Sequence, residues 1–105
     1  MITHTMFVRF TDEIPDEQLD QFLADIKKAT EATGVVRSFA ARRHLSVPGE
    51  ETIPAFIGTV VVQLGVAELD AFATLFGEPA VGAAFDTWRG SNPFTVAWVN
   101  HEALA

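Results

Sequence analysis

The sequence contains no cysteine. A disulfide framework, a thiolate metal site and a cysteine nucleophile are therefore all excluded. Basic residues are also scarce, because seven Lys and Arg stand against fourteen Asp and Glu, for a formal net charge of -7 at pH 7. Such an acidic chain repels a phosphate backbone, so we expect no nucleic-acid partner.

Long apolar runs are missing too. No run approaches membrane-spanning length, and the first residues lack the basic flank, apolar core and small-residue cleavage site of a secretion signal. We expect a soluble, cytoplasmic protein with no membrane partner. The 105 residues are the size of one domain, 1–105. Hydrophobic residues make up 49% of the chain and the mean hydropathy is +0.22, more apolar surface than the core of a small monomer is expected to bury.

One stretch, 76–90, predicts a helix with both ends marked. Pro79 suits the first helical position, and Gly90 suits a left-handed residue just past the helix end. Between them, apolar residues at i, i+3, i+4 and i+7 form one stripe, namely Val81, Ala84, Phe85 and Trp88.

The rest of the chain predicts four strands and two further helical segments. An amphipathic helix begins at Pro15, carries acids in its first turn and stops at Gly34. A short helical stripe over 66–76 ends at Gly77. Residues rich in β-formers predict the strands 2–10, 35–47, 55–64 and 94–99.

This order of elements predicts an α+β fold of the ferredoxin-like split βαβ type. Its antiparallel four-stranded sheet carries helices on one face only, so the other face should be polar in a monomer. Here Phe7 opposes Met6 and Val8 on the first strand, and the third strand shows no polar face. We therefore predict a homodimer in which two sheets pack into a dimeric α/β barrel.

His4 is the strongest candidate for chemistry. Beside Met6 and Val8, a lone imidazole can titrate near neutral pH and transfer a proton. The alternative is a structural histidine bonded to the backbone. Arg43 shares a face with apolar residues and can hold a carboxylate, the alternative being an ion pair at a dimer interface.

Other polar and aromatic residues favour structural roles. Glu78 and Asp86 lie near one face of the last helix, and either becomes a candidate base only if it faces a cavity, whereas Glu78 suits the positive end of the helix dipole. Trp88 and Trp98 can stack on an aromatic ligand or belong to the core. His101 is expected at a frayed end.

A metal site is not expected. The three histidines, which include His44, show no close ligand spacing. We predict no metal and no cofactor, with haem held by one histidine as a remote alternative.

Three segments carry a family resemblance. Residues 4–13 look like the opening His-x-apolar-apolar-apolar-basic-Phe-x-Asp strand of a known family. The helix with Phe22-Leu23 follows at the distance found in that family, and residues 77–81 stand where the family commonly has a His-Pro-x-His element. The chain thus resembles the stress-responsive dimeric α/β-barrel (Dabb) family, which includes plant stress proteins and a polyketide cyclase. Two histidines that the cyclase uses are absent: the element reads Glu78-Pro79-Ala80-Val81, and the third strand begins Ala55-Phe56-Ile57.

The resemblance implies a cavity between sheet and helices. Carried over position by position, its lining comprises His4, Met6, Val8, Phe22, Leu23 and Ile26, with Trp88 from the last helix. Our leading hypothesis is a homodimer that binds a small apolar or aromatic, polyketide-like molecule between sheet and helices. If it catalyses, as a cofactor-free cyclase or lyase, His4 would transfer the proton and Arg43 would anchor an anionic group. The alternatives are a cofactor-free monooxygenase and a non-enzymatic stress-responsive or assembly protein. An open pocket that reaches His4 would favour binding, and a cavity filled by side chains would favour the non-enzymatic alternative.

Overall fold

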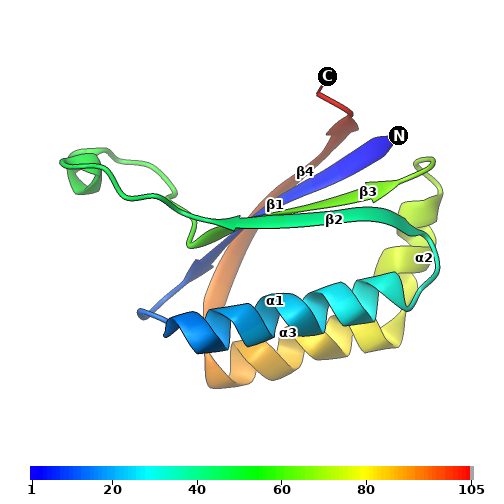
Figure 1. Ribbon diagram of the computed structural model, residues 1–105, viewed down its shortest axis with the longest axis horizontal. Helices are drawn as coiled ribbons and strands as arrows, with labels where there is room; N and C mark the ends of the chain where they lie inside the picture. Colours follow the sequence, from blue (N-terminus) through cyan, green and yellow to red (C-terminus); the bar gives the residue numbers. More distant parts are fainter. Residues whose placement is uncertain (105) are drawn as a thin grey trace.

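The computed structural model describes residues 1–104. Its elements follow one another as β1 (Ile2–Phe10), α1 (Asp16–Glu31), β2 (Val36–Arg43), the 3₁₀ turn η1 (Glu50–Thr52), β3 (Val60–Val66), α2 (Ala71–Gly77), α3 (Pro79–Ser91) and β4 (Phe94–Glu102). The four strands form one antiparallel sheet in the order β2-β3-β1-β4. Figure 1 shows α1 and α3 side by side on one face of this sheet. The predicted α+β, ferredoxin-like architecture is confirmed.

The core lies between the sheet and α1. The apolar residues of α1 recur at helical spacing, so Leu19, Phe22 and Ile26 are buried together. Alternate residues of the two central strands face them, because side chains in a strand point to opposite faces in turn. These buried strand residues are Met6, Val8 and Phe10 of β1 and Val60, Val62, Leu64 and Val66 of β3.

In the part of the chain that the structure describes, the opposite face of the sheet carries no helix (Figure 1). Phe7 lies there beside Val61 and Ala97, its partners on the two neighbouring strands. Phe7 is 41% exposed, and Val99 on the same face is 51% exposed. We call this surface, made of Phe7, Val61, Ala97 and Val99, the bare face. The prediction that the sheet has apolar residues on both faces is thus confirmed.

Three predicted strands differ in their bounds. Pairing between β2 and β3 ends at Arg43, opposite Val60. The predicted strands 35–47 and 55–64 therefore shorten at this end, and 44–59 becomes a connection. In the other direction β3 extends to Val66, and β4 continues to Glu102, because β1 offers partners as far as Ile2. His101 therefore lies inside β4 and not at a frayed end.

The predicted roles of the glycines are corrected in part. Gly34 has a φ of 81° and ends α1 as expected. Gly77 and Gly90 lie within α2 and α3, and neither has a positive φ. Gly65 lies within β3, where it pairs with Thr3 of β1. Ser38 of β2 approaches it at a β-bulge, so a Cβ at this position would clash with the Ser38 Oγ.

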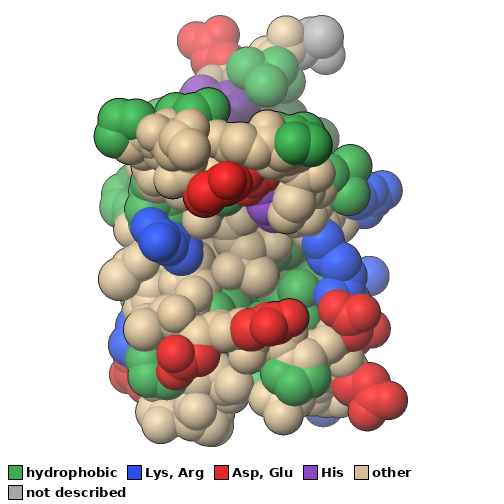
Figure 2. Space-filling model, turned by 90° about the vertical axis from the view of Figure 1, so that its left-hand side faces the viewer, with side chains coloured by type: hydrophobic (Ala, Val, Ile, Leu, Met, Phe, Trp, Pro, Cys, Tyr) green, Lys and Arg blue, Asp and Glu red, His purple; other side chains and the backbone are tan. Residues whose placement is uncertain are grey.

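The connection between β2 and β3 projects beyond the end of the sheet (Figure 1). Seen from that end, several hydrophobic side chains lie on the upper part of the surface, where this connection lies. An acidic patch lies among them, and further acidic side chains are spread over the lower part (Figure 2). Within residues 1–104, no helix is both long enough and apolar enough to cross a membrane.

Candidate functional site: a pocket between the sheet and α3

A pocket of about 280 Å³ lies between α3 and the helix-facing side of β1 and β4. Val81 near the start of α3 and Arg89 near its end both line it. These two residues are eight positions apart, so at about 1.5 Å per residue the pocket follows roughly 12 Å of the helix. Its lining residues are His4, Met6, Thr30, Leu64, Phe76, Val81, Gly82, Phe85, Asp86, Arg89, Val96 and Trp98.

Within residues 1–104, His4 is one of two buried polar residues that line this pocket, the other being Thr30. His4 occupies an inward position of β1 and is only 3% exposed. Strand pairing places Asn100 of β4 directly opposite, and His4 Nδ1 lies 2.7 Å from Asn100 Oδ1. With this oxygen as the acceptor, Nδ1 carries the proton and donates it to the hydrogen bond. The lone pair of the neutral ring is therefore on Nε2.

Aromatic rings surround the imidazole. Its centroid lies 5.9 Å from that of Phe72, 5.0 Å from that of Phe76 and 5.2 Å from that of Trp98. Phe76 and Trp98 are 49% and 57% exposed, whereas Phe72 is buried. The ring thus lies at the base of an apolar wall whose outer part is open to solvent.

Burial lowers the pKa of His4 below its usual value, because the charged imidazolium loses solvation, and the hydrogen bond to Asn100 opposes this effect in part. The neutral form is consequently favoured at neutral pH. A neutral imidazole whose Nδ1–H is held has the protonation state of a general base.

Two charged side chains of α3 line the pocket farther along. Arg89 Nη1 donates to Asp86 Oδ1 at 3.1 Å, one helical turn away. The Arg89 guanidinium carbon also lies 4.5 Å from the centroid of the Phe94 ring. Asp86 meets the condition set from the sequence for a carboxylate that faces a cavity, whereas Glu78 caps α3 by accepting a hydrogen bond from the amide of Ala80.

Sequence reasoning missed Asn100 and Arg89. Arg89 could have been found from its position three residues after Asp86, which places both on one side of a helix. Asn100 could not, because its place opposite His4 depends on the register between the first strand and the last.

The predicted ligand-binding residues separate into two groups. His4 and Met6 line the pocket. The others do not: Val8, Phe22 and Ile26 are fully buried in the core, and Leu23 packs against that core half-buried. Trp88 of α3 lies toward α1, and its Nε1 donates to Asp25 Oδ2 at 2.8 Å. Their direct roles in ligand binding stay predictions.

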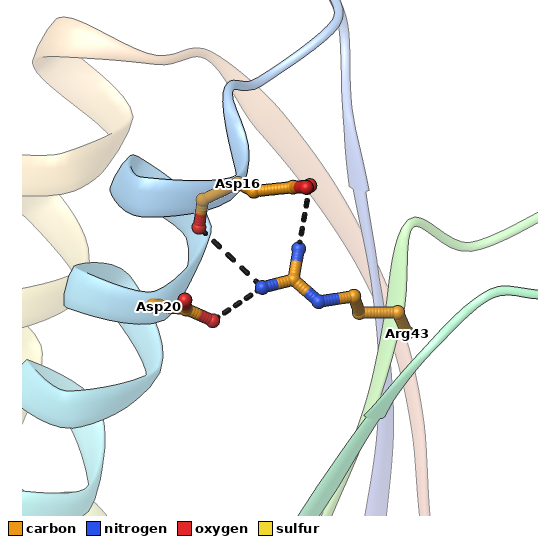
Figure 3. Close-up of polar contacts among 3 residues, drawn as sticks. All are labelled: Asp16, Asp20 and Arg43. Atoms are coloured by element: carbon orange, nitrogen blue, oxygen red, sulfur yellow. Dashed lines mark hydrogen bonds and ion pairs between the residues drawn. The ribbon is translucent and has the colours of Figure 1, made fainter.

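Arg43 also lies away from this pocket. It faces α1, and its guanidinium donates to Asp16 Oδ1 at 2.9 Å and to the carboxylate of Asp20 (Figure 3). Both ion pairs of Arg43 thus join residues of the same chain, with the acidic partners in the first turns of α1. Its role as an anchor for an anionic ligand stays a prediction.

The other two histidines lie apart from His4. His101 Nε2 is 2.6 Å from Thr5 Oγ1 on the bare face, and His44 Nε2 is 2.6 Å from Glu50 Oε2 in the β2–β3 connection. Among residues 1–104 no group of three or more histidines and carboxylates is placed to hold a metal ion.

No family model and no curated protein matches this chain. Solved structures do share its fold. A hydroxynitrile lyase from Passiflora edulis superposes with a TM-score of 0.75 at 14% identity, covering 99% of this chain and 94% of the lyase. A dabb family protein with a ferredoxin-like fold from Mesorhizobium loti has a TM-score of 0.70 and 21% identity, over 99% of this chain and 97% of that one. A dimeric ferredoxin-like protein of unknown function from Thermobifida fusca has a TM-score of 0.73 and 17% identity, over 97% and 90%.

These structures confirm the fold that the resemblance to the Dabb family predicted. At such identities the likeness is one of fold, and function has to be argued from the site of this chain.

Proposed function

We propose that this protein is a homodimer that binds a small, largely apolar, aromatic molecule between the sheet and α3, and that His4 Nε2 acts on it as a general base. The observation that carries the proposal is the buried imidazole of His4, fixed through Nδ1 by Asn100, in an open pocket with apolar walls. A pocket that reaches His4 favours binding over a purely structural role.

The chemistry follows from the state of the ring. Nε2 takes a proton from a phenol or from a carbon next to a carbonyl, and the bound molecule keeps the electron pair as a phenolate or enolate. The resulting imidazolium keeps its hydrogen bond from Nδ1 to Asn100 Oδ1, which compensates part of the cost of a buried charge. The same proton returns to the product in a later step. This is proton-transfer chemistry of the kind that cofactor-free cyclases and lyases use, and the hydroxynitrile lyase from Passiflora edulis shares the fold.

The homodimer is argued from the bare face. Its exposed apolar side chains, among them Phe7 and Val99, lie on the face of the sheet that no helix within residues 1–104 covers. The bare face of a second copy offers the same apolar surface to cover it, about a two-fold axis. The fold neighbour from Thermobifida fusca is described as dimeric, which supports this proposal.

Ligand binding is tested by ¹H–¹⁵N NMR of the two tryptophan indole groups, with 4-phenylphenol as the probe. Trp98 lines the pocket, whereas Trp88 Nε1 is engaged with Asp25. We expect saturable shifts of the Trp98 indole signal and a Trp88 signal that stays in place. No shift of either signal, or a larger shift of Trp88, would count against this pocket.

The role of His4 is tested with His4→Gln and the matched variant Asn100→Leu. We expect both to weaken binding of the phenol, because one removes the acceptor and the other releases the ring that presents it. Removal of an uncharged hydrogen bond corresponds to a loss of up to about tenfold in affinity. Unchanged binding in both variants would overturn the assignment of His4.

The dimer is tested by analytical ultracentrifugation of Phe7→Lys and of the control Leu69→Lys. Leu69 is also exposed but lies outside the sheet. We expect a dimer for the native protein and for the control, and a monomer for Phe7→Lys, because a buried lysine in the sheet interface lacks a partner charge. A monomeric native protein would refute the homodimer.

A further inference from the structure

We propose that Arg89 binds a carboxylate of the ligand at the end of the pocket opposite His4, so that the pocket selects elongated aromatic molecules with one anionic end. This inference rests on the proposed function, because it concerns the same pocket. It adds the charge and the shape of the molecule that fits.

The two polar ends of the pocket are set by the sheet. His4 pairs with Asn100 near the end of β4, whereas Arg89 lies over the ring of Phe94 at the start of that strand. Between the two ends the wall is apolar and includes Met6 and Val96. A ligand that contacts both ends therefore has an apolar body, and the helix between Val81 and Arg89 gives it a length of roughly 12 Å.

The side chain of Arg89 is preorganised to bind an anion. Its guanidinium stacks on Phe94, which is itself buried and packs edge-on against Phe10 and Phe22. This platform restricts the arginine side chain before any ligand binds. Within residues 1–104 its one hydrogen bond is that of Nη1 to Asp86, so Nε and Nη2 remain free to donate in the planar fork that fits a carboxylate.

The charges in the pocket favour one anion and not two. Among residues 1–104, Arg89 is the only Lys or Arg that lines it, in a chain with a net charge of -7. Asp86 is largely exposed, so its pair with Arg89 is screened and contributes little that a ligand must replace. The same Asp86 carboxylate repels a second negative charge on the ligand. A monocarboxylate thus suits this end of the pocket.

The test compares two probes of one shape, biphenyl-4-carboxylate and the neutral 4-phenylphenol, by the shift of the Trp98 indole signal at pH 7.5. In Arg89→Gln we expect the affinity for the carboxylate to fall about tenfold, as for loss of a charged hydrogen bond, while the affinity for the phenol changes less than about twofold. Arg89→Lys keeps the charge without the fork and should give an intermediate loss. Asp86→Asn, the matched control, should strengthen carboxylate binding.

The outcomes separate this inference from the proposed function. If both probes bind and Arg89→Gln lowers neither affinity, or lowers both equally, the assignment of Arg89 is overturned and the pocket stands. If neither probe shifts Trp98 in the native protein, both proposals fail. An unchanged Trp88 signal in every variant verifies that the fold is retained.

Discussion

Two regions between the sheet and the helices differ in how they are filled. Around Phe22, where α1 meets α3, rings interlock edge to face, with centroids 5.2 Å from Phe10, 5.7 Å from Phe94 and 5.7 Å from Trp88. We call this the packed region. Along β4, by contrast, Trp98 and Val96 face the helices and remain exposed above a pocket. We call this the hollow region.

The difference explains why the residues of the predicted cavity lining fall into two groups. Alternation in β1 correctly placed His4, Met6 and Val8 on one face, since strand geometry alone decides that. Whether space remains above each residue depends on what the helices bring to it. Val8 and Phe22 are both fully buried in the core, whereas α3 leaves a gap along β4. Variants in the two regions test whether they differ in packing.

The largest effect is expected for truncation in the packed region. Phe22→Ala removes a fully buried ring, and we expect the free energy of unfolding to fall by about 3–5 kcal/mol. Phe76→Ala in the hollow region should cost less than about 1 kcal/mol, because that ring is half-exposed. Urea unfolding followed by circular dichroism, at one protein concentration, measures both. Equal losses would contradict the distinction.

A smaller effect is expected for the two tryptophans. Trp88→Phe removes the Nε1 donor that holds Asp25 across the two helices, and we expect a loss of about 1 kcal/mol. For Trp98→Phe we expect a smaller loss of stability but weaker binding of 4-phenylphenol. The same unfolding experiment checks the stabilities. Isothermal titration calorimetry measures the affinity for 4-phenylphenol, because Trp98→Phe lacks the indole signal of Trp98. A stability loss at Trp98 as large as that at Trp88 would show that β4 is packed after all.

At the outer edge of the packed region, Arg43→Gln should lower stability by less than about 1 kcal/mol. The aspartates that Arg43 contacts are exposed, so water and salt screen these ion pairs. Repeating the urea unfolding in high salt should shrink the difference further. A large loss that salt does not affect would indicate a structural role beyond the ion pairs.

The smallest effect is expected from the titration of His4, a single group whose desolvation is partly offset by Asn100. Its pKa is lowered in the folded protein, so below about 6.5, the value for an unfolded chain, the unfolded state takes up a proton more readily. The contribution of His4 to stability is therefore lost as the pH falls from that value through the lowered pKa. Unfolding between pH 7.5 and 5 should show a shallower decline for His4→Gln. Identical slopes would indicate an unperturbed histidine.

How far the sequence predicts this site varies from residue to residue. The inward position of His4 follows from alternation, and the placement of Asp86 and Arg89 on one side of α3 follows from helical spacing. The position of Trp88 did not follow: its stripe indicated a buried face, but not that this face meets α1 at Asp25. The spacing of apolar residues within a helix does not show which other element that helix packs against.

By itself the sequence determined the order of the helices and strands and which face of each carries apolar residues, because both properties depend on the spacing of residues along the chain. It also determined that both faces of the sheet carry apolar residues. Tertiary structure alone decided the register that sets Asn100 against His4 and lays Arg89 over Phe94. It also decided which part of the interior is filled. The register and the filling of the interior both depend on contacts between segments far apart in the chain. The pocket lies where α3 and the sheet do not pack fully against each other.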